Sequence, residues 1–199
     1  MLFDFFHRGG PVMWPLLLTS IIALAVVVER LLFILKENRL RNPQAVQTIL
    51  THVEKGNIPA AIQEGEGSED FVAKTLTYAL THNETSFSNA LLLAANQALQ
   101  PFNRGLAVLD TIITLAPLLG LFGTVTGMIH AFGLLGNKGL EAPTVITGGI
   151  AEALIATAFG LVIAIISLIP FNYLTNRLEI ARREIEDAAT YLELIILKQ

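Results

Sequence analysis

Three polar side chains lie inside long apolar stretches of the sequence, where polar chemistry is costly. Thr124 falls in residues 111–137, which carry no formal charge, and Glu152 and Thr157 fall in residues 142–176, whose one charged residue is Glu152. Hydroxyl groups at membrane depth can hydrogen-bond water or an ion, whereas a carboxylate there costs about 3 kcal/mol and usually marks an ion pathway. We therefore take these three residues as candidates for an ion pathway. For Glu152 the alternative is a hydrogen-bonded carboxylic acid that holds helices together.

The spacing of the candidates predicts that the two threonines meet. If residues 111–137 and 142–173 form antiparallel helices, Thr124 lies at the midpoint of the first and Thr157 beside the midpoint of the second. Both hydroxyls would then reach the same depth. Glu152 lies five residues from Thr157, so their side chains are ~140° apart on a regular helix. Two arrangements stay open: a wide polar face, or Glu152 at the edge of that face against a neighbouring subunit.

Small residues form a stripe beside Thr124. Gly120, Gly127 and Ala131 recur with it at helical spacing. Small residues let helices approach closely in lipid, so we assign Gly120 and Gly127 either to packing or to a minor role in the pathway. His130, about two turns outward of Thr124, could relay protons, although a hydrogen-bonded histidine near the end of a span is the commoner case.

The elements that position these residues are predicted to be membrane-spanning helices. The chain has 199 residues, of which 53% are hydrophobic and 15% charged, with a mean hydropathy of +0.59. Apolar runs of 18 or more residues are long enough to span a bilayer, and three are present, the first beginning at Pro11. The sequence predicts an all-α integral membrane protein with three transmembrane helices that extend into the cytoplasm.

Lysine and arginine residues near the ends of spans indicate the orientation. They concentrate in residues 36–107 and 177–199, so we expect these segments in the cytoplasm and the N-terminus outside. The predicted order is as follows: outer N-terminus and first transmembrane helix, 1–35; cytoplasmic helical segment, 36–107; second transmembrane helix, 108–137; outer loop, 138–146; third transmembrane helix, 147–176; cytoplasmic helical tail, 177–199.

The cytoplasmic segment carries several helix signals. Asn42 followed by Pro43 predicts a helix start, Gly56 its end, and "NIPAAIQ" a second start. A further helix is predicted from near "TSFSNALLLAANQAL", with a kink or restart at Pro101. At about 70 residues, the segment is expected to bury no large core of its own. The tail is expected to pack on a neighbour through a stripe of apolar residues: Leu178, Ile185, Leu192 and Ile196.

Several classes of enzyme site are missing from the sequence. It contains no G-x-G-x-x-G, no G-K-[ST] phosphate loop and no H-E-x-x-H, and its four histidines are scattered. With no cysteine, it has neither disulfides nor thiolate metal ligands. We therefore expect no enzyme activity, no cofactor, no metal and no nucleic-acid partner, and any energy it uses should come from an ion gradient.

Two motifs carry a resemblance to a known family. "APLLGLFGTVTGMIHAF" and "GGIAEALIATAFGLVIAIISLIPFNYLTNRLE" resemble the MotA/TolQ/ExbB proton-channel family, and "GGPVMWPLLLTSIIALAVVVERLLFIL" is similar to its first span. The likeness covers all three predicted spans. Because the flagellar stator branch has four spans, the chain resembles the ExbB/TolQ branch more closely.

The resemblance implies an assembly and a function. It implies a homopentamer in the bacterial inner membrane, in contact with membrane lipids, around the single transmembrane helices of a dimeric ExbD/TolR-like partner, with a TonB-like or TolA-like protein beyond. The pathway residues of the family fall on Thr124, Glu152 and Thr157. An ExbB-like subunit that energises TonB-type outer-membrane import is the expected function. The alternatives are a TolQ-like subunit for envelope maintenance and a scaffold that conducts nothing, and the choice between proton and sodium stays open.

Overall fold

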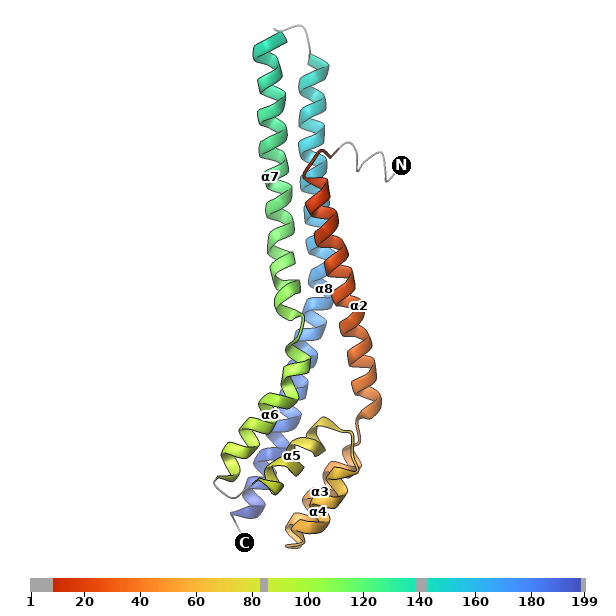
Figure 1. The fold of residues 1–199 in the computed structure, drawn as a ribbon, viewed down its shortest axis with the longest axis vertical. Helices are drawn as coiled ribbons and strands as arrows, with labels where there is room; N and C mark the ends of the chain where they lie inside the picture. Colours follow the sequence, from red (N-terminus) through yellow and green to blue (C-terminus); the bar gives the residue numbers. More distant parts are fainter. Residues whose placement is uncertain (1–8, 83–85, 139–142, 198–199) are drawn as a thin grey trace. The chain divides into compact units, whose positions relative to one another are not determined.

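The structure, a computed structural model, describes residues 9–82, 86–138 and 143–197, and the regular structure of these residues is entirely helical (Figure 1). This confirms the all-α prediction. The helices are α2 (Met13–Leu40), α3 (Pro43–Glu54), α4 (Ile58–Glu66), α5 (Phe71–Thr81), α6 (Phe87–Asn103), α7 (Leu106–Lys138) and α8 (Pro143–Ile196). The described residues fall into two compact units. Unit 1 comprises residues up to Glu29 with Gly105–Asn172, and unit 2 comprises Arg30–Arg104 with the chain from Tyr173 onward.

Helices α2, α7 and α8 are each long and apolar enough to cross a membrane, as predicted. Their most apolar 18-residue windows have mean hydropathies of 2.3, 2.0 and 2.5, and no more than a third of each window is buried within the chain. Helix α8 continues without a break through the predicted third span and the tail. The exact membrane boundaries stay predictions, and the predicted outer segments at 1–8 and 139–142 lie outside the described residues.

Unit 1 is held together by a small apolar core at the start of α2. Val12, Met13 and Leu16 are buried with Ala116 of α7, and Phe159 of α8 packs against them. The beginning of α2 therefore lies against both of the other apolar helices. This contact fixes which faces of α7 and α8 are covered and which remain open.

The predicted helix starts in unit 2 are confirmed. The side chain of Asn42 accepts a hydrogen bond from the N–H of Ala45 (3.2 Å), and Asn57 accepts one from Ala60 (3.2 Å). Such caps satisfy N–H groups that have no partner within the helix. Between the two helices, Gly56 has a φ of +71°, which other residues rarely adopt.

The helix that contains Pro101 ends just after this residue and not at it. Helix α6 passes through Pro101 and ends at Asn103, and Gly105, with a φ of +81°, precedes the start of α7. The guanidinium of Arg30, which is 4% exposed, donates to the Pro101 carbonyl (2.7 Å). Arg30 thus supplies a partner and a positive charge at the C-terminal end of α6, where carbonyl groups lack helical partners.

Unit 2 buries a larger core than the sequence predicts. Ile49, Ala61 and Leu76 are fully buried within the chain, and so is Leu192 of α8. The reason is that the middle segment does not form this core alone: helix α8 lies against it and supplies one wall. The tail therefore packs within its own chain, through Leu178, Ile185 and Leu192 as predicted, but with Ile195 buried in place of Ile196.

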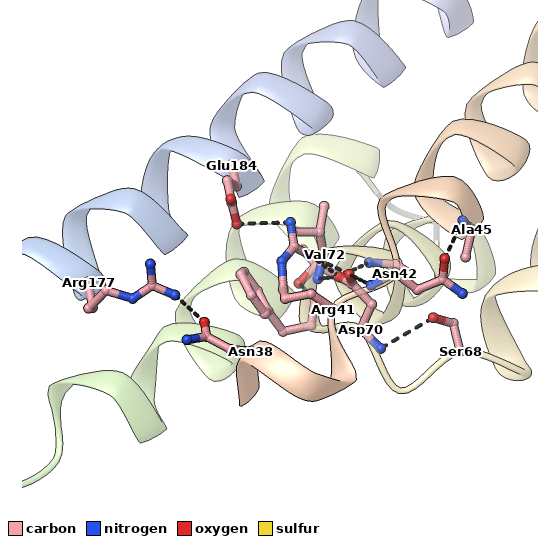
Figure 2. A network of polar contacts seen from close by, with 12 residues as sticks. Asn38, Arg41, Asn42, Ala45, Ser68, Asp70, Val72, Arg177 and Glu184 are labelled. Carbon is pink, nitrogen blue, oxygen red and sulfur yellow. Dashed lines mark hydrogen bonds and ion pairs between the residues drawn. The ribbon is translucent and has the colours of Figure 1, made fainter. Parts of the chain in front are cut away.

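A buried carboxylate ties four segments of unit 2 together (Figure 2). Asp70 is fully buried and accepts hydrogen bonds from the N–H groups of residues 72–73 at the start of α5 and from that of Asn42 (2.6 Å). Arg41 donates to the Asp70 carboxylate and also pairs with Glu184 of α8 (2.9 Å). Because every oxygen of Asp70 has a donor, the buried charge is compensated.

Candidate functional site

Helices α7 and α8 meet along a seam of small residues in unit 1. A Cβ on Gly120 would lie 2.9 Å from the Cα of Thr157, and one on Gly127 would lie 3.0 Å from the Cβ of Ala153. Farther along, a Cβ on Gly149 would lie 2.6 Å from the Cβ of Ala131. These pairs run in opposite directions along the two helices, so the helices are antiparallel. At Gly120 the two backbones are too close to accommodate any side chain. In this structure Gly120 therefore contributes to the packing of the two helices.

The hydroxyl groups of Thr124 and Thr157 contact each other across this seam. Thr157 Oγ1 also donates to the carbonyl of Gly120 (3.0 Å), and Thr124 Oγ1 lies 3.3 Å from the carbonyls of Gly120 and Ala153. The two threonines therefore meet at one level, as their positions in the sequence predict. Each side chain is half-buried, so part of its surface remains accessible.

The hydroxyl pair has hydrogen-bonding capacity to spare. Each hydroxyl has one proton and two acceptor lone pairs, and the contact between them uses one proton and one lone pair. The second proton can point to the Gly120 carbonyl or, by rotation about the C–O bond, elsewhere. The pair can therefore accept a hydrogen bond from water or from another donor without separating the helices.

Apolar side chains surround the pair on the open side of the seam. Leu121 of α7 is 56% exposed, and Leu154 and Leu161 of α8 are 61% and 48% exposed. By helical spacing they share the side of each helix that carries Thr124 and Thr157. We call these five residues the threonine face. Within it, the two hydroxyls are the polar groups of an otherwise apolar surface.

Glu152 lies on the other side of α8, next to the segment that leads into α2. Its carboxylate occupies the space that a Cβ on Gly10 would need, and Gly10 has a φ of +72°. Nearby, Ile155 lies beside Gly9, so this side of α8 faces the start of α2. The structure thus brings the two threonines together and places Glu152 away from them. Its position at the edge of a polar face against a neighbouring subunit, one of the two arrangements left open by the sequence, stays a prediction.

His130 is exposed and does not join the threonine face. It lies six residues beyond Thr124, ~120° around α7. Among the residues that the structure describes, no three histidine, cysteine, aspartate or glutamate side chains lie close enough together to hold a metal ion.

The contact between Gly10 and Glu152 was not predicted from the sequence. The available signal was "GGP" before the first apolar run, because paired glycines ahead of a proline favour a turn with unusual backbone angles. No spacing rule connects that turn to a carboxylate about 140 residues later. The contact exists because α8 packs against the segment that leads into α2.

Comparison with known proteins identifies the family. Residues 63–187 match the model of the MotA/TolQ/ExbB proton channel family. The chain is 37% identical to a Synechocystis protein named as biopolymer transport protein ExbB-like 1, over 88% of this chain and 71% of that protein. It is 30% identical to an ExbB homolog of Methanothermobacter thermautotrophicus, over 88% of this chain and 63% of that protein.

A relative from a second branch matches over a shorter stretch. The Tol-Pal system protein TolQ of Haemophilus influenzae is 40% identical over 46% of this chain and 39% of its own length. The family match covers more than half of the chain and includes all five residues of the threonine face. The chain belongs to the MotA/TolQ/ExbB proton channel family.

Proposed function

We propose that the chain is the ExbB-like subunit of an inner-membrane motor that uses proton flow to do mechanical work on the cell envelope. Its membership of a proton channel family and its similarity to proteins named for biopolymer transport support this proposal. The observation that carries it is the contact between the Thr124 and Thr157 hydroxyls on an exposed apolar face. A helix that only sat in lipid would not need this polar pair.

In this proposal the threonine face lines the pore of a homopentamer. Five copies would present ten hydroxyls at one level around the transmembrane helices of a dimeric ExbD/TolR-like partner. Hydroxyls can pass a proton between neighbours but do not bind it firmly at neutral pH, so a carboxylate has to complete the path. Because Glu152 lies against Gly10 on the other side of α8, that carboxylate would come from the partner.

The position of Glu152 in the sequence suggests that it belongs to the ion pathway. In this proposal it has a different role. Its place beside the turn before α2 lets it fix the start of that helix against α8. We propose that it acts at the outer end of the subunit, with residues 36–107 and 177–199 in the cytoplasm and the N-terminus outside. The concentration of lysine and arginine in those two segments supports this orientation.

Proton flux into liposomes that contain the chain and its ExbD/TolR-like partner tests the role of the pair. We expect Thr157→Val, which keeps the shape and removes the hydroxyl, to abolish flux, and Thr157→Ser to retain most of it. Thr126→Val is the matched control, since the Thr126 hydroxyl bonds to the carbonyl of Phe122 in its own helix (3.0 Å). Full flux in Thr157→Val would remove the threonine pair from the pathway.

A TolQ-like role in envelope maintenance is the second candidate. The 40% identity to the Haemophilus influenzae TolQ over 46% of this chain supports it, and the 37% identity to the ExbB-like relative extends over 88% of this chain. Co-purification with the product of a neighbouring gene distinguishes the two roles. A TonB-like third protein in the complex supports the ExbB-like role, and a TolA-like protein supports the TolQ-like one.

A further inference from the structure

A pocket of about 420 Å³ opens within unit 2 where α2, α5 and α6 meet. Its size lies within the range of ~300–1,000 Å³ that is typical of small-molecule sites. The residues that line it include an aromatic floor and a charged rim, and neither is part of the threonine face. The proposed channel function does not use this pocket, so what it could bind is a separate question.

The floor of the pocket is rigid and apolar. Phe102 is 7% exposed, and its ring packs edge-on against Phe33 and Phe71, with 5.2 Å between ring centroids in each pair. Ala94 and Ala98 of α6 complete the floor and leave room above it. Such a surface favours an apolar group of a ligand over water.

The rim carries charges of both signs in equal number. Lys36 and Glu37 come from α2, Glu69 lies just before α5, and Lys74 lies in the first turn of α5. Lys74 Nζ lies 2.5 Å from Glu69 Oε2, which leaves two of its three N–H donors for a ligand. Within the described part of the chain, Lys36 and Glu37 form no hydrogen bond or ion pair with each other or with another side chain. The rim therefore offers donors for an anion and a free carboxylate for a cation.

The position of the pocket on α2 relates it to the membrane. Beyond the charged pair at residues 29–30, a last apolar stretch of α2 ends at Leu35, and the pocket is lined by Phe33 on the apolar side of that point and by Lys36 and Glu37 on the charged side. The exposed Leu32 and Leu35 flank the same turn. A pocket at the level where an apolar span gives way to charge lies at the depth of lipid headgroups.

We propose that this pocket binds one phospholipid with a zwitterionic headgroup, of the phosphatidylethanolamine type, from the leaflet at the Leu35 end of α2. The lipid phosphate would contact Lys36 and the free donors of Lys74, and its ammonium would contact Glu37. The glycerol and the first acyl carbons would cover Phe33 and Phe102. An anionic headgroup would leave Glu37 without a cation, and a choline headgroup has no N–H to donate to it.

Native mass spectrometry of the purified full chain tests this proposal, with phosphatidylethanolamine, phosphatidylglycerol and phosphatidylcholine of matched acyl chains at equal concentration. The wild type should retain one phosphatidylethanolamine per subunit in preference to the other two. Partly exposed ion pairs contribute modestly, so Glu37→Gln should weaken that preference roughly two- to five-fold and leave phosphatidylglycerol retention unchanged. Glu64→Gln, which removes an exposed carboxylate outside the pocket, should change nothing.

A variant whose side chain fills the pocket distinguishes lipid bound inside the pocket from lipid that adheres elsewhere on the protein. Ala98→Trp should abolish retention of the lipid while the thermal unfolding temperature and the proton flux show that the protein is intact. Equal retention of the three lipids by the wild type, or retention unchanged in Ala98→Trp, would overturn the proposal. So would binding of soluble phosphoethanolamine in the pocket without retention of the lipid. The lipid retention and the thermal unfolding temperature do not depend on which ion the channel conducts, so failure of the proposed channel function would leave this test valid.

Discussion

Adding one methyl group to the α7–α8 seam, as in Gly120→Ala, should slow proton flow about tenfold without changing a polar side chain. The new Cβ would lie 2.9 Å from the Cα of Thr157 and 3.0 Å from the carbonyl oxygen of Ala156. Both are backbone atoms that cannot swing aside. Carbon atoms pack at about 3.5–4.0 Å, so the helices have to separate by ~0.6–1 Å.

That separation is enough to break the hydrogen bond across the seam. The distance from Thr157 Oγ1 to the Gly120 carbonyl is 3.0 Å, and adding the separation takes it to about 3.6–4 Å, beyond hydrogen-bond range. Losing one such bond costs about 1–1.5 kcal/mol, and if the barrier to proton transfer rises by that amount, flux falls roughly 5- to 13-fold. Overpacking of the seam should also destabilise the helix pair by ~1–3 kcal/mol.

The assay is proton flux in liposomes with the partner, together with unfolding in a denaturing detergent. Gly133→Ala is the matched control, because it lies on the same helix and a Cβ there meets no atom within 4 Å. Flux and stability of Gly120→Ala equal to those of the wild type would refute the close approach of the two backbones. An equal loss in Gly133→Ala would show that the effect is not specific to the seam.

Three further outcomes follow from other parts of the chain. Gly10→Ala should displace the Glu152 carboxylate and strain a backbone with a φ of +72°, so the unfolding temperature should fall. In a Glu152→Ala background, which removes the clashing atoms, a part of the loss should remain because of backbone strain, and an unchanged unfolding temperature there would contradict the strain. Asp70→Ala removes a buried carboxylate and a helix cap, so the free energy of unfolding should fall by about 3–5 kcal/mol, whereas a loss under 1 kcal/mol in chemical denaturation would contradict its structural role. The hydrogen bond from Lys74, and then its positive charge, lower the pKa of Glu69 below its ordinary value of 4.5. This carboxylate should therefore stabilise the fold above that pH and lose its contribution as the pH falls. In Lys74→Met, NMR titration should find the pKa of Glu69 at its ordinary value.

The depth of the threonines could be predicted from the sequence, but their direction could not. The rise of ~1.5 Å per residue fixes where Thr124 and Thr157 lie along antiparallel helices of similar length. Which side of α8 remains open depends on where α2 packs, and that is decided by the contact of Val12 and Met13 with α7 and α8. The separation of Glu152 from the pair follows from the same contact.

Local signals were readable in unit 2, and its long-range contacts were not. Asn42 and Asn57 cap helices because a short polar side chain reaches the backbone N–H three residues on. The pairing of Asp70 with Arg41 joins residues far apart in the sequence, and Glu184 lies farther still. Such partners become neighbours only once the helices have packed. The size of the core that they border was therefore underestimated from the sequence.

Cysteine labelling in the assembled complex measures whether the threonine face lines a hydrated path. The chain contains no cysteine, so Thr157→Cys is the one thiol of that variant. A control at Ile129, ~140° around α7 from Thr124, reports on a different face of the same helix. We predict that a charged, water-soluble thiol reagent labels Thr157→Cys and blocks proton flux, and that Ile129→Cys resists it. Labelling of Thr157→Cys by a lipid-soluble reagent alone would contradict the account.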